Sequence, residues 1–267
     1  MPATRNGLNV LVIGSTGSIG QLAVGEALRK GHTVRALARD VTKARRLLEG
    51  ADVIQGDLTR PDSLIPAVNG VDAIVFTHGS DGGGKAGSEA VDYGGVRNAL
   101  VALDGRIVRI ALMTAIGVTN RTGSYNRSTQ AHDWKRRGER LVRASGNPYT
   151  IVRPGWFDYN ADDQHHLEFL QGDRRHAGDP SDGVVSRAQI AEVLVASLTS
   201  DAAQRKTLEL VATKGPAKRD LEPLFSALEP DRAGALDGVK DLANMDLAEE
   251  PQRVRDDLER VTKQRGR

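Results

Sequence analysis

Hydrophobic and polar positions follow two alternating patterns along this chain. Short apolar runs with the character of buried strands occur at residues 9–13, 32–38, 51–58, 71–76, 106–113 and 149–153. Between them lie segments with apolar residues at helical spacing, at 19–27, 61–69, 92–103, 128–145 and 186–198. Strands that alternate with helices predict an α/β fold with a mostly parallel sheet.

The first strand runs directly into a loop in which glycine recurs at every third position. Glycines let such a turn tighten and let backbone N–H groups approach a ligand, and the following helix adds its partial positive charge. Both features suit the pyrophosphate of a dinucleotide. An ordinary strand-to-helix turn, with glycines for packing, is the alternative. The predicted contacts are Gly14, Thr16, Gly17, Ser18, Ile19 and Gly20.

The second strand is followed by Arg39 and Asp40. In dinucleotide-binding folds this strand end faces the adenosine ribose, where an acid hydrogen-bonds the 2′-hydroxyl and an arginine pairs with a 2′-phosphate. Arg39 therefore favours NADPH over NADH as the cofactor. Two alternatives remain open: Asp40 could serve the hydroxyl, and Arg39 could be a solvated residue at a strand end.

Two further strand ends supply candidate ligands. Asp57 and Leu58 follow the third strand and would border the adenine, although an aspartate after a glycine is also a common turn residue. The fourth strand leads into His78 and then the glycine-rich residues 79–85, which predicts a mobile rim of a cleft. His78 is a candidate acid or base there, or a residue that only lines the pocket.

Composition limits the classes of protein to consider. A chain of 267 residues, 39% hydrophobic, suits one α/β domain, or one with an appended lobe, and it contains no apolar run long enough to span a membrane. Residues 1–7 lack the apolar centre of a secretory signal, so we expect a cytoplasmic protein. The absence of cysteine excludes disulfides and thiol nucleophiles, and the formal charge of +2 argues against a nucleic-acid partner.

Four features in order carry a resemblance to a known family: the Gly14-x-x-Gly17-x-x-Gly20 loop, Gly56-Asp57, Lys135 on its helix, and Arg153-Pro154-Gly155 after the sixth strand. Over roughly residues 8–213 the chain resembles the atypical short-chain dehydrogenase/reductase superfamily, specifically its NmrA-like branch. The resemblance implies a doubly wound Rossmann domain that binds NAD(P), with a small C-terminal substrate lobe. We therefore expect the Rossmann domain at 1–213, with 155–186 contributing to the lobe, and a helical extension of the lobe at 214–267.

The same resemblance assigns roles to residues around the nicotinamide. Lys135 would hold the nicotinamide ribose, and the turn after the sixth strand would pass close to the nicotinamide. The other implied cofactor contacts are His78, Gly79, Thr114, Pro154, Gly155, Trp156 and Phe157. A small-molecule substrate would then lie against Ser80, Ala115, Ala131, Trp134, Trp156 and Phe157.

The chain departs from that family where the proton is donated. Active reductases of the superfamily use a tyrosine four residues before the lysine and a serine at the end of the fifth strand, and these positions match Ala131 and Ala115. Neither alanine can donate a proton or a hydrogen bond. Tyr125 and His132 are nearby in sequence and join Lys135 as candidate catalytic residues, with a structural role as the alternative for both.

The remaining chain is less regular. Residues 160–182 are polar and could form a helix and a loop above the cleft. His165 and His166 would point apart on a helix, and no acid–histidine spacing completes a site, so we predict no metal. Residues 207–212 predict a seventh strand. Beyond residue 214, prolines interrupt charged segments, which favours short helices, packing on a second subunit of a homo-oligomer, or partial disorder.

Two functions follow from these observations. The first is an NAD(P)H-dependent oxidoreductase acting on an aromatic, quinone-like molecule, because a quinone that takes hydride becomes a delocalised phenolate and needs less help from an acid than an alkoxide does. Its electron-rich product could react with dioxygen, which would give a monooxygenase-like hydroxylation without flavin or metal. The second is a non-catalytic NAD(P)-binding redox sensor, as some NmrA-like proteins are, and Ala115 and Ala131 support it.

Overall fold

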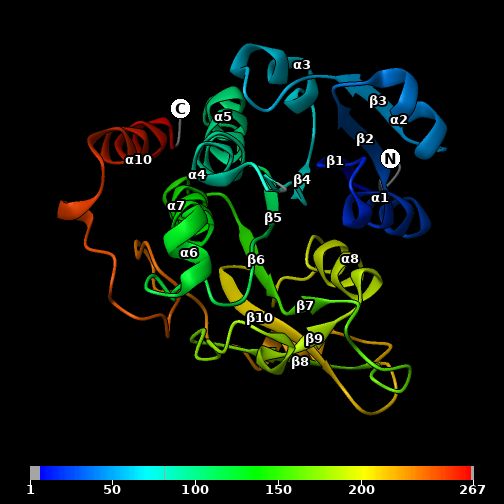
Figure 1. Cartoon of the computed structure of the whole chain (residues 1–267). Coiled ribbons are helices and arrows are strands. Elements are labelled where there is room, and N and C mark those ends of the chain that lie inside the picture. Colours follow the sequence, from blue (N-terminus) through cyan, green and yellow to red (C-terminus); the bar gives the residue numbers. More distant parts are fainter. Residues whose placement is uncertain (1–6, 81, 266–267) are drawn as a thin grey trace.

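A parallel sheet forms the centre of the molecule in the computed structural model, which describes residues 7–80 and 82–265. Its strands lie in the order β3-β2-β1-β4-β5-β6-β10 (Figure 1). They are β1 (Asn9–Ile13), β2 (Thr33–Ala38), β3 (Asp52–Gln55), β4 (Ala73–Phe76), β5 (Arg109–Met113), β6 (Tyr149–Pro154) and β10 (Lys206–Thr213). The expected doubly wound α/β fold is confirmed. Because successive strands leave β1 in opposite directions, the sheet has a switch point between β1 and β4, where such folds bind ligands.

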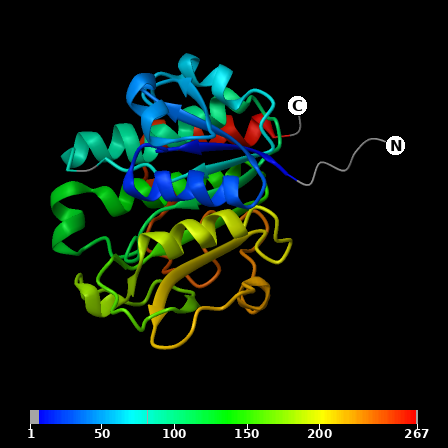
Figure 2. The same ribbon diagram turned by 90° about the vertical axis from the view of Figure 1, so that its right-hand side faces the viewer.

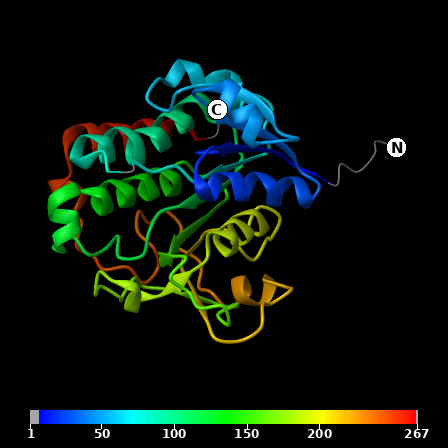
Figure 3. The same ribbon diagram turned by 45° about the vertical axis from the view of Figure 1, so that its right-hand side comes forward.

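Helices cover both faces of this sheet and bury its apolar strands. On one face, α1 (Ser18–Arg29), α2 (Val41–Leu47) and α8 (Arg187–Ala196) pack in one apolar cluster. On the other face lie η1 (Pro61–Leu64), α3 (Ile65–Val68), α5 (Gly94–Leu103), α7 (Ala131–Ala144) and α10 (Gln252–Gln264). Figure 2 shows α1 and α8 side by side, and Figure 3 shows α10 alongside α5 and α7. Strands covered on both faces explain the continuous apolar runs in the sequence.

Two helices differ from their expected bounds. The helix expected at 92–103 is preceded without a break by α4 (Gly84–Gly87) and a π-helical turn, η2 (Ser88–Tyr93), so part of the glycine-rich rim is helical. The helix expected at 128–145 is two helices, α6 (Ser124–Thr129) and α7, because Gln130 adopts a left-handed φ of 56°. Hydrophobic spacing does not reveal a break that a single polar residue makes.

The predicted helix within residues 160–182 is wrong. This segment contains β8 (His166–Leu170), which pairs antiparallel with β10, and a short turn, η3 (Pro180–Asp182). β7 (Trp156–Phe157) and β9 (Val184–Val185) extend the same edge of the sheet. The partner strand of β8 lies some forty residues further along the chain, so local sequence could not show that a strand forms here. No group of metal-binding side chains gathers in residues 7–80 and 82–265.

The C-terminal segment passes β8 and returns to the face of the sheet that α5 and α7 cover. After α9 (Glu222–Ser226), the strap formed by residues 229–250 crosses α7 and includes η4 (Leu247–Glu249), and α10 then packs on α5 and α7. Buried arginines on α7 pair with the strap: Arg136 and Arg140 with Asp237, Arg137 with Glu250, and Arg143 with Asp231. The acidic side chains of the strap therefore neutralise the buried arginines of α7. The domain boundary at 213 and the homo-oligomer stay predictions.

None of the helices in the described part of the chain has the length and apolar character needed to cross a membrane.

Candidate functional site

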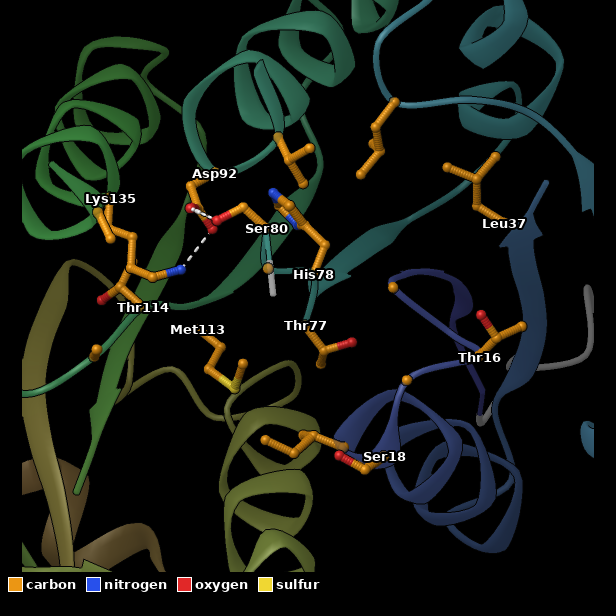
Figure 4. Close-up of a pocket in the computed structure, with 18 of the residues that line it drawn as sticks. Thr16, Ser18, Leu37, Thr77, His78, Ser80, Asp92, Met113, Thr114 and Lys135 are labelled. Atoms are coloured by element: carbon orange, nitrogen blue, oxygen red, sulfur yellow. Dashed lines mark hydrogen bonds and ion pairs between the residues drawn. The ribbon is translucent and has the colours of Figure 1, made fainter. Parts of the chain in front are cut away.

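A cavity of about 720 Å³ opens at the carboxyl ends of β1 to β5, at the switch point of the sheet. Its volume is within the range of cofactor and small-molecule sites. Figure 4 shows side chains from several elements converging on it. Most of the predicted site residues line it: Gly14, Thr16, Gly17, Ser18, Ile19, Arg39, Asp57, Leu58, His78, Gly79, Ser80, Thr114, Ala115, Tyr125, Ala131, Lys135 and Phe157.

The glycine loop forms one wall of the cavity and leaves the start of α1 open. Gly14 has a φ of +85°, and a Cβ there would lie 2.6 Å from the backbone nitrogen of His78, so only glycine fits between β1 and β4. Gly17 is the N-cap of α1 and supplies no capping side chain, which leaves the first backbone N–H groups of the helix free for an anion. Gly20 does not line the cavity. A Cβ on Gly20 would lie 2.0 Å from the Gly14 carbonyl oxygen, so its place is in helix–strand packing.

The end of the cavity beside β2 and β3 carries a cation and an acid. Arg39 lines it, whereas the Asp40 side chain accepts the Lys43 N–H at 2.9 Å and caps α2. The carboxylate that competed with Arg39 in the sequence therefore already has a structural role. Asp57 accepts the backbone N–H and the hydroxyl of Thr59, and these hydrogen bonds lower the pKa of Asp57.

A buried ion pair lies at the opposite end of the cavity. Lys135 Nζ is 2.6 Å from Asp92 Oδ1, and the Ser80 hydroxyl donates to Asp92 Oδ2 at 2.7 Å (Figure 4). The Asp92 side chain is 1% exposed, so this pair is formed away from bulk water. Asp92 is missing from the predicted site. The available signal in the sequence was an acidic residue beside the apolar positions of a helix. Asp92 lies in a π-helical turn, a backbone form that is common at functional sites but cannot be seen in the sequence.

His78 is held neutral at this end of the cavity. Burial, followed by the nearby charge of Lys135, lowers the pKa of His78 to about 4. Its Nδ1 is buried and has no hydrogen-bond partner among residues 7–80 and 82–265. An imidazole that is neutral at pH 7 cannot act as a cationic acid, which favours the reading that His78 lines the pocket.

The structure separates the two candidates for the missing acid. Tyr125 lines the cavity and is 56% exposed, whereas His132 lies behind it, with ring centroids 5.2 Å apart, and does not reach the wall. Burial lowers the pKa of His132. Ala115 and Ala131 both line the cavity, so the space that serine and tyrosine would fill is open.

Besides Gly20, four predicted contacts do not line the cavity: Trp134, Trp156, Pro154 and Gly155. Trp134 is buried, with the Arg137 guanidinium carbon 4.4 Å from its ring centroid, and it packs on Tyr93 in the core. Trp156 points outward, with Tyr159 against its edge. Pro154 belongs to β6, and Gly155 packs so closely that a Cβ would lie 2.4 Å from the Gly183 carbonyl oxygen.

Comparisons with known proteins agree with this geometry. A profile of the family described as NAD(P)H-binding matches residues 14–201. The chain is 26% identical over 262 residues to sanguinarine reductase of Eschscholzia californica, covering 82% of this chain and 95% of that protein. It is 29% identical over 229 residues to the photosystem II assembly factor Ycf39 of Cyanophora paradoxa, covering 85% of this chain and 70% of that protein.

Among solved structures, a putative NAD-dependent epimerase/dehydratase from Bacillus halodurans is similar to this fold, with a TM-score of 0.68 at 21% identity. The match covers 83% of this chain and the whole of that chain. At this identity the likeness supports the fold.

Proposed function

The chain belongs to the NAD(P)H-binding family, and from this premise we propose that it is an oxidoreductase that reduces a planar, quinone-like aromatic molecule with NADPH. The observation that carries the proposal is the cavity itself. One wall is a glycine loop at an uncapped helix start, and the far end holds the Lys135–Asp92 pair beside two alanines.

The residues present fit a nicotinamide dinucleotide. A Cβ at Gly17 would meet only the Gly14 carbonyl oxygen, at 3.2 Å, so the cavity side of the loop is clear for a phosphate. The start of α1 would hold the pyrophosphate, Arg39 a 2′-phosphate, and Lys135 the ribose next to the nicotinamide. When bound, the reduced nicotinamide supplies the hydride. The preference for the phosphorylated form rests on Arg39 and on the capping role of Asp40.

The far end of the cavity suits a substrate that needs little acid catalysis. Lys135 carries a positive charge there that would stabilise a phenolate, and Ala115 and Ala131 leave room for a wide ring. Ser80 commits its only proton to Asp92, so it offers lone pairs to a ligand. Tyr125 and Phe157 are the aromatic side chains of the wall against which a ring would stack.

The second candidate function is a redox sensor that binds NAD(P) without turnover. The two alanines in the cavity wall favour it, since they remove the usual proton donors from an otherwise complete site. A photosystem II assembly factor among the relatives shows that proteins similar to this chain are also known by roles in assembly.

The test is NADPH consumption by the wild-type protein against a panel of naphthoquinones and aliphatic ketones. We expect turnover of quinones and none of simple ketones, because an alkoxide product needs a positioned acid that contributes about 10²–10⁴-fold in rate. The matched variant is Ala131→Tyr with Ala115→Ser, which restores the usual donors. Product analysis with and without dioxygen decides whether hydroxylation follows reduction.

The outcomes separate the two functions. If the double variant reduces quinones faster than wild type, or if only ketones are reduced, the idea that this cavity dispenses with an acid is wrong. If no substrate is turned over while the reduced and oxidised cofactors both bind tightly, the sensor is the better account.

A further inference from the structure

One cation, at the start of α8, lies beside the glycine loop at the phosphate end of the cavity. Arg187 is the first residue of α8, and its Nε donates to the Ser18 hydroxyl at 3.0 Å. Ser18 is the first residue of α1 and lines the cavity next to Gly17. The two helices lie side by side (Figure 2), so their N-terminal ends meet at this point.

Two residues at the end of β7, Phe157 and Asp158, hold the rest of the Arg187 side chain in place. Asp158 accepts the Arg187 backbone N–H at 2.9 Å and also pairs with Nη1 of the guanidinium. The guanidinium carbon lies 5.4 Å from the centre of the Phe157 ring, which lines the cavity. Asp158 itself has a left-handed φ of 57°, directly after Phe157. These contacts fix a cation where the start of α8 touches the start of α1.

The guanidinium retains donors for a ligand. Arginine has five N–H groups, and Arg187 uses one on Ser18 and one or more of those on Nη1 for Asp158. Nη2 has no hydrogen-bonding partner within the described ranges, 7–80 and 82–265. The side chain is 35% exposed, and it contacts two residues of the cavity wall, Ser18 and Phe157, without lining the cavity itself.

We infer that Arg187 binds the pyrophosphate of the dinucleotide, as a ligand that the start of α8 adds to the glycine loop. The inference rests on the proposed cofactor site. Planar guanidinium groups bind phosphate through paired, charge-assisted hydrogen bonds. The contact would also link the bound cofactor to the segment after β6, since Phe157 and Asp158 both contact the Arg187 side chain.

The experiment measures binding of NADPH and of NADH by calorimetry, independently of turnover. Arg187→Met should weaken both about tenfold, by the same factor, because a charge-assisted contact to a shared pyrophosphate is lost. Arg29→Met is the matched control: it removes one positive charge from the other end of α1, where Arg29 pairs with Glu26, and should change neither affinity. Thermal unfolding of each variant verifies folding.

Asp158→Asn distinguishes a ligand from a structural link. Asparagine tolerates the left-handed φ, and the change removes the carboxylate that competes with phosphate for Arg187. It should tighten both cofactors several-fold, opposite in sign to Arg187→Met. If Arg187 only ties the lobe to α1, both variants cut the same link and both weaken binding. If Arg187→Met does not fold, the cofactor affinities of Asp158→Asn and Arg187→Lys still show whether Arg187 is a ligand or a structural link.

Several results would overturn the inference. They are unchanged affinity in Arg187→Met, a loss confined to NADPH, or a loss of affinity in Asp158→Asn. If the wild-type protein turns over no substrate but Arg187→Met still weakens cofactor binding as expected, Arg187 is a phosphate ligand and only the proposed reductase activity is wrong. If the wild-type protein bound neither NADPH nor NADH, both proposals would fall.

Discussion

Glu209 gives a prediction whose size follows from its surroundings. It lies on β10, accepts the Asp173 backbone N–H at 3.1 Å, and is 3.5 Å from Arg153 Nη1. Arg153 also pairs with Glu139 and Asp241, so one guanidinium faces three carboxyl groups. Burial raises the pKa of Glu209 from 4.5 to about 8.

The sign of the pH dependence follows from where the proton is bound. Between pH 4.5 and about 8 the folded protein keeps a proton on Glu209 that the unfolded chain has released, so the free energy of unfolding falls as the pH rises. Each pH unit is worth about 1.4 kcal/mol, which makes the loss roughly 3 kcal/mol between pH 5.5 and 8. Below pH 4.5 both states are protonated and the effect ends.

Glu209→Gln tests this reasoning, because glutamine copies the protonated side chain and does not titrate. Urea unfolding of wild type and variant at pH 5.5, 7 and 8.5 should give similar stabilities at pH 5.5 and a variant that is more stable by roughly 3 kcal/mol at pH 8.5. Other titrating groups are common to both proteins and cancel in the difference. Glu229→Gln, at an exposed acid, is the control. A difference between Glu209→Gln and wild type that stays constant across this range would refute the reasoning.

Two further predictions concern the cofactor. Lys135→Met should weaken cofactor binding about tenfold by removing a charged contact, and it should also destabilise the fold because Asp92 is left as a buried, unpaired carboxylate. The double variant Lys135→Met, Asp92→Asn should regain stability in urea unfolding but should not regain cofactor affinity. If both variants bind the cofactor as tightly as wild type, Lys135 has a purely structural role. Arg39→Ala should cost roughly 1.5 kcal/mol of NADPH binding and leave NADH binding unchanged in calorimetric titration; equal losses for the two cofactors would contradict the placement of Arg39 at the 2′-phosphate.

The parts of the fold that local sequence determines were predictable. Strands buried on both faces, such as β1 and β4, are apolar along most of their length, and the loop after β1 needs glycine wherever β4 or the start of α1 comes close, so both could be recognised in the sequence. The family resemblance added Lys135 and the positions of the two missing donors, and these residues lie together in one cavity.

What could not be predicted depends on partners far away in the sequence. β8 exists because β10 offers it an edge, and Trp134 is core because Tyr93 and Arg137 cover it. Asp92 becomes part of the candidate site only when η2 brings it to Lys135, forty-three positions later. Arg187 reaches Ser18 across most of the chain. In each case the residue type was visible but its neighbour was not.

The arginines of α7 have a consequence for the order in which the chain becomes structured during synthesis. Arg136, Arg137 and Arg140 find their carboxylates about a hundred residues later, in the strap. A ribosome adds about 5–20 residues per second, so α7 waits on the order of ten seconds before its charges can be paired. Burying them earlier would cost several kcal/mol for each unpaired guanidinium. We therefore expect the nascent α7 to stay hydrated until residues 229–250 have left the ribosome, and the cavity, which takes Lys135 from that helix, to be completed only then.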